Sequence, residues 1–420
     1  MRIRVILSLA LAAAAFAQQG RRVDDNVLKN APKTGEEWLS YGLTPGETRY
    51  SPLKQIDASN ISRLGLAWTY ELGPGGGTQE ATPIVWNNTI YGITTWSVVF
   101  AVDARTGKEL WRWDPEVNQT TVRPKICCGV VNRGVAIYDG KIVAPTLDGR
   151  LFGLDAITGR PVWETRVAYA QDNYTITIAP RIAKGKAIVG VSGAEFPVRG
   201  FIAAYDVKTG KESWRFYTVP GDPSKPFENE AMRKAAATWD SAALKKYAGV
   251  GGTVWDAIAY DPDLDLVYFG TGNAGPWPAD LHGGGEGKDL LYVDSIVAVD
   301  ANTGAYKWHY QTVPGDEWDY DSVAHLMLAD VVIKGQPRKV IMQANKNGFY
   351  YVIDRTNGKF ISGQPYASIT WAKGLNEETG RPIINKESYY SEKESAIINP
   401  GPGGAHNWSP MSFNPATGLV

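Results

Sequence analysis

Two clusters of reactive side chains stand out in the sequence, and the first is a pair of cysteines. Cys127 and Cys128 are adjacent, and they are the only cysteines in the 420-residue chain. In an oxidising compartment two neighbouring thiols can join only each other, and the ring they form braces no distant part of the chain. The pair therefore indicates local surface chemistry, unless the thiols are buried and stay reduced as small hydrophobic side chains. The residue types alone leave both alternatives open.

The second cluster is an acidic run, Asp316–Asp321, with the sequence Asp-Glu-Trp-Asp-Tyr-Asp. Four carboxylates within six residues repel one another unless water or a cation neutralises them. The run therefore indicates either a solvated acidic loop or a cation site. For Asp316 and Glu317 we expect the solvated loop.

The N-terminus has the pattern of an export signal. Arg2 and Arg4 precede the apolar run Val5–Ala15, and a small-residue cleavage motif ends at Ala17. We expect residues 1–17 to be a signal peptide cleaved after Ala17, which gives a periplasmic or secreted mature chain. No stretch is long and apolar enough to span a bilayer. The net charge is −1 with acids and bases interleaved, so neither nucleic acid nor a membrane surface is expected as a partner.

A unit of two strands joined by a glycine turn recurs along the chain, and its second strand usually carries a tryptophan. The copies are Ala101–Trp113, Gly153–Thr165, Ala204–Phe216, Ala298–Tyr310 and, more weakly, Val352–Phe360. A period of about fifty residues is typical of propeller blades, which must stack on their neighbours to bury both faces. The sequence therefore predicts an all-β fold, a β-propeller of four-stranded blades with docking tryptophans. About five to six blades fit into the residues present.

One interval between copies is nearly twice as long as the others. Within it, Lys225–Tyr247 is rich in Ala, Lys and Glu, which predicts one or two helices outside the sheets at about 222–250. The chain stops partway through another turn unit, whereas a propeller must close on itself to remove its sheet edges. We therefore expect residues 18–420 to form one propeller domain that is incomplete at its C-terminus.

Several short motifs follow one another in order between about Trp38 and the last residue. They include CCGVVNRG, TITIAP, GVSGAE, TGNAGPW and DEWDYD. Each is weak alone, but together they closely resemble the pyrroloquinoline quinone (PQQ) alcohol dehydrogenases. The resemblance implies an eight-bladed propeller with PQQ and a metal ion on its axis.

The resemblance also implies which residues surround the cofactor. Cys127 and Cys128 would form a disulfide on one face of the quinone, and the indole of Trp255 would lie under the other face, because a flat cofactor gains from flat apolar partners. Arg133 would pair with cofactor oxygens as a planar fork. The alternatives are a core tryptophan and a solvated surface arginine. Further residues that match the family's pocket are Glu80, Thr177, Ser192, Gly193, Ala194, Thr253, Lys346 and Asn407.

A metal site is implied in the same way. Its ligands would be Glu195, Asn273 and Asp319, because a hard cation prefers carboxylate and amide oxygens. Asp321 lies two residues past Asp319, where calcium-type relatives carry a small uncharged residue and lanthanide-dependent relatives carry Asp. Asp321 would then be a fourth ligand, and its additional negative charge favours a lanthanide over Ca²⁺. The alternative is that Asp321 points to solvent.

The function implied by the resemblance is that of a periplasmic quinoprotein that oxidises primary alcohols to aldehydes. Asp319 would accept the hydroxyl proton, the hydride of the alcohol would pass to PQQ, and the metal would act as a Lewis acid. The chain contains no Cys-x-x-Cys-His haem motif. A separate periplasmic cytochrome c is therefore the expected electron acceptor, unless residues beyond Val420 hold a haem.

Other functions stay open on the sequence alone. A non-catalytic propeller that acts as a binding or assembly protein would share the repeat, because a fold does not dictate a function. Such a protein would be expected to lack the adjacent cysteines, the metal set and the acidic run, and to carry a lipid-anchor cysteine. An inactive, truncated relative is a further alternative. The sequence decides neither which alcohol is oxidised nor whether the chain forms a homodimer.

Overall fold

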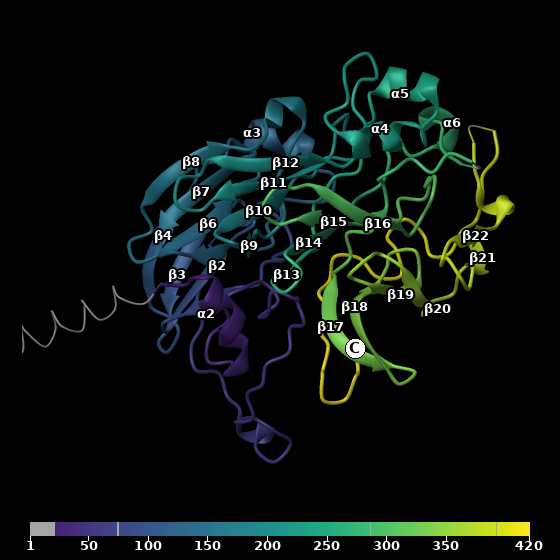
Figure 1. The fold of residues 1–420 in the computed structure, drawn as a ribbon. Coiled ribbons are helices and arrows are strands. Elements are labelled where there is room, and N and C mark those ends of the chain that lie inside the picture. The colour runs from purple at the N-terminus through teal and green to yellow at the C-terminus, as the bar shows by residue number, and fades with distance from the viewer. Residues whose placement is uncertain (1–21, 74, 286, 392) are drawn as a thin grey trace, which may run out of the picture.

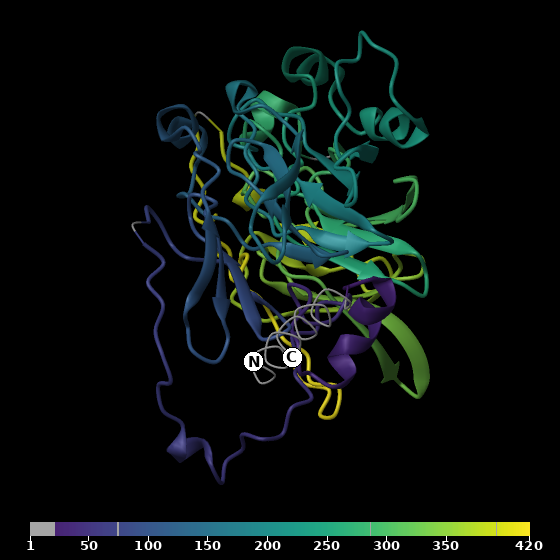
Figure 2. The same cartoon turned by 90° about the vertical axis from the view of Figure 1, so that its left-hand side faces the viewer.

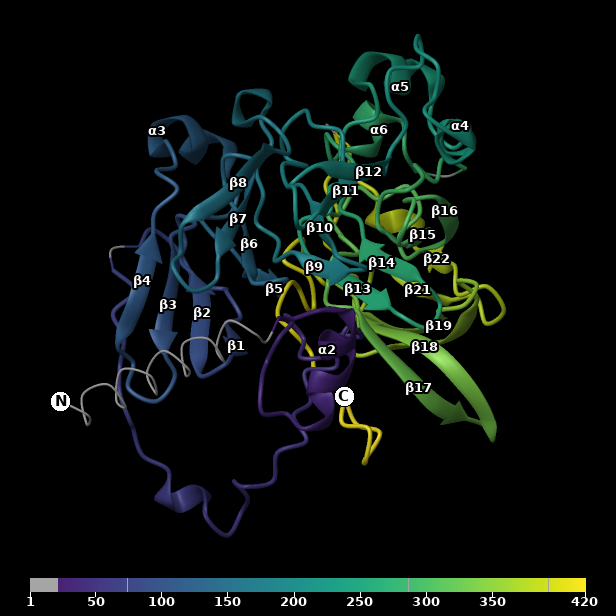
Figure 3. The same ribbon diagram turned by 60° about the vertical axis from the view of Figure 1, so that its left-hand side comes forward.

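The strands form successive antiparallel sheets that lie side by side around a common centre (Figures 1 and 3). The computed structural model describes residues 22–73, 75–285, 287–391 and 393–420, so the predicted signal peptide lies outside the described residues. Within these ranges there are five four-stranded sheets and one pair of strands, and each sheet uses strands that are consecutive in the chain. The prediction of an all-β propeller with five to six blades is confirmed.

Each blade contains four strands that follow one another in the chain. The first consists of β1 (Ile84–Trp86), β2 (Thr89–Ile93), β3 (Val99–Asp103) and β4 (Glu109–Trp113). The second consists of β5 (Ala136–Tyr138), β6 (Lys141–Pro145), β7 (Arg150–Asp155) and β8 (Pro161–Arg166). The third consists of β9 (Arg181–Ala183), β10 (Lys186–Gly190), β11 (Phe201–Asp206) and β12 (Glu212–Tyr217).

The remaining strands follow the same order. The fourth blade consists of β13 (Ile258–Asp261), β14 (Leu266–Gly270), β15 (Ser295–Asp300) and β16 (Tyr306–Gln311). The fifth consists of β17 (Met327–Ile333), β18 (Gln336–Ala344), β19 (Phe349–Asp354) and β20 (Phe360–Pro365). The last pair is β21 (Ala372–Leu375) and β22 (Pro382–Ile384).

The helices are short and lie outside the sheets. They are α2 (Asp25–Asn30), α3 (Gln119–Val122), α4 (Glu230–Ala236), α5 (Ser241–Tyr247) and α6 (Ala279–His282). The helices α4 and α5 fall within the segment for which the sequence predicts helices, and they lie together with α6 at one edge of the molecule (Figure 1). Asn229 and Asp240 cap them by accepting backbone N–H groups of the first turn. None of the described helices has the length and apolarity needed to cross a bilayer.

Each repeated turn is the docking site for a tryptophan. Gly159 has a φ of +71°, and a methyl group on its Cα would approach the ring of Trp111 to 2.5 Å. The indole N–H of Trp111 donates to the Ala156 carbonyl at 3.1 Å. Glycine is therefore needed here both for its backbone conformation and for the space that it leaves. The same ring-to-glycine contact is made by Trp68 on Gly107, Trp163 on Gly210, Trp214 on Gly304 and Trp308 on Gly358.

The apolar core lies between neighbouring blades. One buried cluster joins the first and second sheets through side chains such as Ile93 and Ile142. A second cluster joins the second, third and fourth sheets, and a third cluster joins the fourth and fifth sheets, where Tyr268 and Tyr351 are buried together. Each sheet thus covers the face of the next, which removes the apolar surface of both from water.

The segment that leads to the first docking tryptophan protrudes from the body as a long loop (Figure 2). Its apolar side chains are exposed to solvent, and they are Leu53, Ile56, Ile61, Leu64 and Leu66. Trp68 at its end nevertheless makes the contact that the other docking tryptophans make, with its indole N–H donating to the Ala104 carbonyl at 3.2 Å.

The docking contact yields a stability prediction. We expect Gly159→Ala to destabilise the protein by about 2–5 kcal/mol, because the left-handed backbone conformation and the overpacking against Trp111 both cost free energy. Gly140→Ala is the matched control, because Gly140 has a φ of +72° but open space around its Cα. It should cost only about 1–2 kcal/mol. Urea denaturation of the two variants measures the difference, and equal losses would contradict an inter-blade role for the turn glycine.

Candidate active site

The connections at one end of the propeller carry the candidate site. The sheets are antiparallel, so the segment before the first strand of a blade and the connection between its second and third strands meet at the same end. Glu80 precedes β1, Arg133 precedes β5 and Trp255 precedes β13, whereas Ser192 follows β10 and Lys346 follows β18. The first strands β5, β9, β13 and β17 contact one another in sequence, so they are the innermost strands. Blades far apart in the chain therefore present side chains to one central space.

Backbone hydrogen bonds between blades fix these segments relative to one another. The Thr82 N–H donates to the Arg133 carbonyl at 3.1 Å, and the Arg133 N–H donates to the Thr177 carbonyl at 3.0 Å. A parallel bridge pairs Thr82 with Gly134. The side chains that leave these segments are held by the ring of blades rather than by a mobile loop.

A cavity of about 390 Å³ opens at this end, which is in the size range of small-molecule sites. Most of the predicted site residues line it, namely Glu80, Cys127, Cys128, Arg133, Thr177, Ser192, Gly193, Glu195, Trp255, Asp319, Asp321, Lys346 and Asn407. Three predicted residues are buried behind this lining. Ala194 and Thr253 are nearly or fully inaccessible, and Asn273 donates its backbone N–H to Oδ1 of Asp321 at 2.9 Å.

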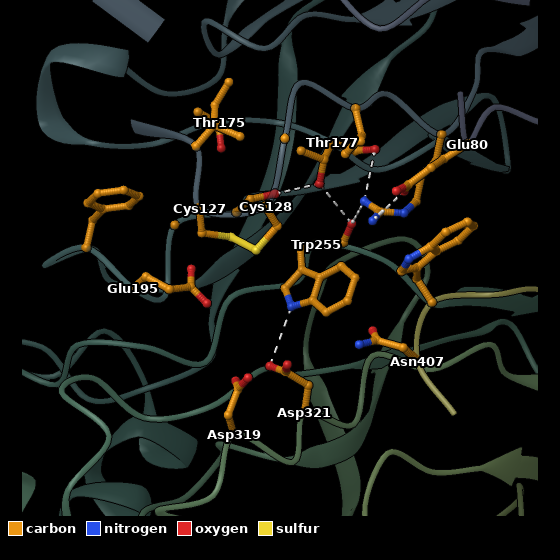
Figure 4. A pocket seen from close by; sticks show the side chains of 18 of the residues that line it. Glu80, Cys127, Cys128, Thr175, Thr177, Glu195, Trp255, Asp319, Asp321 and Asn407 are labelled. Carbon is orange, nitrogen blue, oxygen red and sulfur yellow. Dashed lines mark hydrogen bonds and ion pairs between the residues drawn. A yellow bond between two sulfur atoms is a disulfide. The ribbon is translucent and has the colours of Figure 1, made fainter. Parts of the chain in front are cut away.

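The adjacent cysteines form a disulfide at the cavity wall. Cys127 and Cys128 are joined, and both are exposed rather than buried. The alternative of two reduced, buried thiols is therefore wrong. The disulfide and the indole of Trp255 border the same space, with Asp319 and Asp321 beyond the indole nitrogen (Figure 4). The indole N–H of Trp255 donates to Oδ1 of Asp321 at 3.5 Å.

A buried guanidinium lies on another side of the cavity. Arg133 is 4 % exposed, which excludes the solvated surface alternative. Its Nη2 lies 2.8 Å from Oε2 of Glu80, and its Nε lies 3.9 Å from Asp256. The guanidinium carbon also lies 5.0 Å and 5.6 Å from the ring centroids of Trp255 and Trp408. Burial raises the pKa of Glu80, and the charge of Arg133 opposes that rise.

The acidic side of the cavity is bridged by an ammonium group. Nζ of Lys346 lies 2.8 Å from Oδ2 of Asp319 and 2.8 Å from Oδ2 of Asp321. Burial and then the charge of Asp321 raise the pKa of Asp319, while Lys346 opposes the rise. Burial and then Asp321 also raise the pKa of Glu195, whose side chain is open to the cavity. Burial lowers the pKa of Lys346, but the two carboxylates outweigh it and raise that pKa overall, so the ammonium stays charged.

The sequence matches one family model over most of this region. Residues 38–373 match the PQQ β-propeller domain of glucose, ethanol and alcohol dehydrogenases. The chain belongs to the PQQ-dependent alcohol dehydrogenase family. This finding confirms the resemblance inferred from the motifs.

Three similar proteins show how far the likeness extends. The quinohemoprotein alcohol dehydrogenase ADH IIB of Pseudomonas putida is 50 % identical over 100 % of this chain and 60 % of its own length. The 1-butanol dehydrogenase (cytochrome c) of Thauera butanivorans is 46 % identical over 92 % of this chain and 55 % of its own length. A solved europium-containing methanol dehydrogenase is 36 % identical, with a TM-score of 0.86, over 94 % of this chain and 69 % of its own. The chain thus spans about three fifths of the curated relatives that it matches.

The predicted metal ligands carry carboxylate and amide oxygens, which a hard cation prefers. Oδ1 of Asp319 and Oδ1 of Asn273 are buried and have no hydrogen-bond partner among the described residues. Such oxygens are costly to bury unless something binds them. Among the described residues, however, no three His, Cys, Asp or Glu side chains are arranged so that they could hold a metal ion. The Lys346 ammonium instead lies between the carboxylates of Asp319 and Asp321. The assignment of the ligands stays a prediction.

One expectation about the acidic run is wrong, and one alternative is excluded. Asp316 and Glu317 were expected to lie in a solvated loop, but they are 2 % and 1 % exposed. Both carboxylates accept backbone N–H groups, which replaces the hydration that they lose. Asp321 does not point to solvent either, because it is 3 % exposed and contacts Lys346 and Asn273.

Sequence reasoning also missed several residues of the cavity. Trp408 packs against Arg133, and Phe196 and Ile126 add apolar surface to the wall. Trp408 directly follows the predicted residue Asn407, so its position in the motif was a usable signal. Phe196 and Ile126 are ordinary hydrophobic residues in the connections between strands, and only the fold brings them to the cavity.

The bridging ammonium yields the second stability prediction. We expect Lys346→Met to destabilise the metal-free protein by about 3–5 kcal/mol, because it leaves buried carboxylates without a counter-charge. Lys29→Met is the control, since the Lys29–Asp263 pair has the same 2.8 Å separation but is exposed. It should change stability little. Thermal unfolding measures both variants, and equal effects would contradict the neutralising role of Lys346.

Proposed function

We propose that this chain is the catalytic propeller of a periplasmic quinoprotein that oxidises primary alcohols to aldehydes. The observation that carries the proposal is that one cavity is bordered by an exposed disulfide, an indole ring, a buried guanidinium and two carboxylates bridged by an ammonium. Membership of the PQQ-dependent family supports it. Buried oxygens without a partner among the described residues lie beside this cavity, which favours a ligand site over a purely structural propeller.

The flat surfaces and polar groups of the cavity suit a planar, acidic cofactor. We propose that PQQ lies between the Cys127–Cys128 disulfide and Trp255, and that Arg133 binds its oxygens. When bound, the quinone accepts the two electrons and the hydrogen of the alcohol as a hydride, with the metal as Lewis acid. The other residues proposed to hold it are Glu80, Thr177, Ser192, Gly193, Ala194, Thr253, Lys346 and Asn407.

We propose Asp319 as the general base that accepts the hydroxyl proton of the alcohol. Its carboxylate faces the cavity, and one of its oxygens has no hydrogen-bond partner among the described residues. Burial and the charge of Asp321 raise its pKa, and this direction of shift makes the ionised carboxylate a stronger base than a solvated carboxylate would be. Lys346 would keep Asp319 aligned through the 2.8 Å ion pair.

We propose a metal site formed by Glu195, Asn273, Asp319 and Asp321, with a lanthanide favoured over Ca²⁺. Three of these ligands are carboxylates, and a trivalent ion balances their charge better than Ca²⁺ does. The burial of Asp321 beside Asn273 supports its inclusion. The likeness to a europium-containing methanol dehydrogenase supports the choice of ion.

The electron acceptor and location complete the proposal. We propose that the electrons pass to a periplasmic cytochrome c. The name of the Thauera butanivorans relative includes cytochrome c, and this supports the proposal. The proposed signal peptide, residues 1–17, would bring the chain to that compartment.

The catalytic assignment is tested by Asp319→Asn in the protein expressed from its complete gene and reconstituted with PQQ and metal. We expect turnover of ethanol to fall by about 10²–10⁴-fold, because the amide cannot accept the proton. Asp263→Asn, an exposed carboxylate, is the control and should keep wild-type turnover. An Asp319→Asn variant with near wild-type turnover would refute the assignment.

The metal assignment is tested by reconstitution with PQQ plus either lanthanum or calcium, with ethanol and methanol as substrates. We expect activity with lanthanum to exceed that with calcium, and Asp321→Ala to abolish this preference because it removes one negative ligand. Terbium emission sensitised by tryptophan measures binding independently of turnover. Activity with calcium alone, unchanged in Asp321→Ala, would show that Asp321 is not a ligand.

A further inference from the structure

The acidic run is anchored so that its residues alternate between the interior and the cavity. Trp318 is 1 % exposed, and its indole N–H donates to the Ser388 carbonyl at 2.9 Å. The hydroxyl of Tyr320 donates to the Pro400 carbonyl. Asp319 and Asp321, which lie between and after these aromatic residues, line the cavity. The two aromatic anchors hold the run in place, but they do not fix the conformation of Asp319 itself.

The backbone of Asp319 has an uncommon conformation. Its φ is +64°, in the left-handed region that residues with a Cβ rarely adopt. Such a conformation costs free energy and persists only where the surroundings determine it. The neighbouring residues of the run must therefore supply interactions that an extended or right-handed backbone could not make.

The carboxylate of Asp316 supplies these interactions. Its Oδ1 accepts the Trp318 N–H at 3.1 Å, and its Oδ2 accepts the Asp319 N–H at 3.1 Å. The Tyr320 N–H also lies 3.4 Å from both oxygens. The Tyr320 N–H follows the φ of Asp319 along the chain, so its approach to the Asp316 carboxylate depends on the left-handed conformation of Asp319. The bonds from the Trp318 and Asp319 N–H groups anchor the segment that precedes this rotation.

Glu317, the neighbouring acid, offers an internal comparison. It is as buried as Asp316, but its carboxylate accepts the N–H groups of Ala279 and Tyr390, at 3.0 Å and 2.8 Å. It thus ties the run to the surrounding segments without contacting the amide of Asp319.

We infer that Asp316 is a positioning residue that holds Asp319 in the left-handed conformation and so aims its carboxylate into the cavity. The inference rests on the proposed function of Asp319 as base. Asp316 touches neither the cavity nor the reacting atoms, since it is not among the residues that line the cavity. Its effect on turnover is exerted through Asp319.

The kinetic test compares Asp316→Ala, Asp316→Asn and Glu317→Gln in the reconstituted protein. We expect Asp316→Ala to lower kcat by about 10–100-fold with little change in KM, because a misplaced base slows the chemical step. Asp316→Asn keeps one carbonyl oxygen as acceptor and should recover part of the loss. Glu317→Gln should keep kcat within about twofold. Equal losses of kcat in the Ala and Gln variants would overturn the specific role of Asp316.

A second test needs no activity. Asp319→Gly and Asp319→Ala both remove the carboxylate, but only glycine adopts a φ of +64° without strain. We expect Asp316→Ala to lower the thermal unfolding midpoint more in the Asp319→Gly background than in the Asp319→Ala background, because alanine at position 319 regains its strain energy when the hydrogen bonds of Asp316 are lost. Equal shifts would overturn the inference even if turnover falls. Absence of alcohol oxidation in the wild-type protein would instead refute the proposed function and leave this unfolding comparison to decide the role of Asp316.

Discussion

A four-stranded sheet with apolar residues on both faces has to be covered on both faces, and this constraint determines the rest of the structure. Each blade meets it by packing against the next, and the buried clusters accordingly join neighbouring sheets. The turn glycines and docking tryptophans fix the stacking, because each ring lies where a Cβ would otherwise be. Blades that stack in this way surround a centre, and their innermost strands deliver loops to it. The candidate site is a consequence of that arrangement.

The same arrangement brings charges together away from bulk water. The negative charges of Asp319 and Asp321 can lie together at the cavity wall because Nζ of Lys346 lies 2.8 Å from Oδ2 of each. On the other side of the cavity, the charge of Arg133 is balanced by Glu80 and Asp256. Burial raises the pKa of Asp256, and the charges of Arg133 and Arg181 oppose that rise. The network is paired within the protein, yet several oxygens keep a free lone pair. A buried site with this balance is suited to bind a charged ligand with little rearrangement.

The acidic run shows how local sequence can mislead. Its density of carboxylates suggested solvation for Asp316 and Glu317, because like charges repel in an isolated loop. In the fold both side chains bind backbone N–H groups, and for Glu317 these come from segments almost forty and more than seventy residues away. No inspection of the run itself could have revealed the donors to Glu317. The aromatic residues Trp318 and Tyr320 are the part of the pattern that did indicate burial.

The sequence by itself determined the repeated strand–turn–strand unit, the propeller class and the family, because these depend on local periodicity, glycine turns and short motifs. It also named most of the residues that line the cavity, through their motif positions. Only the tertiary structure decided that Asp321 is buried, that Lys346 bridges two carboxylates and that Trp408 packs on Arg133. These contacts join residues from different blades or loops, and their distances follow from how the sheets stack, which no single segment encodes. The left-handed conformation of Asp319 belongs with them, since it depends on a carboxylate whose own burial is set by the surrounding fold.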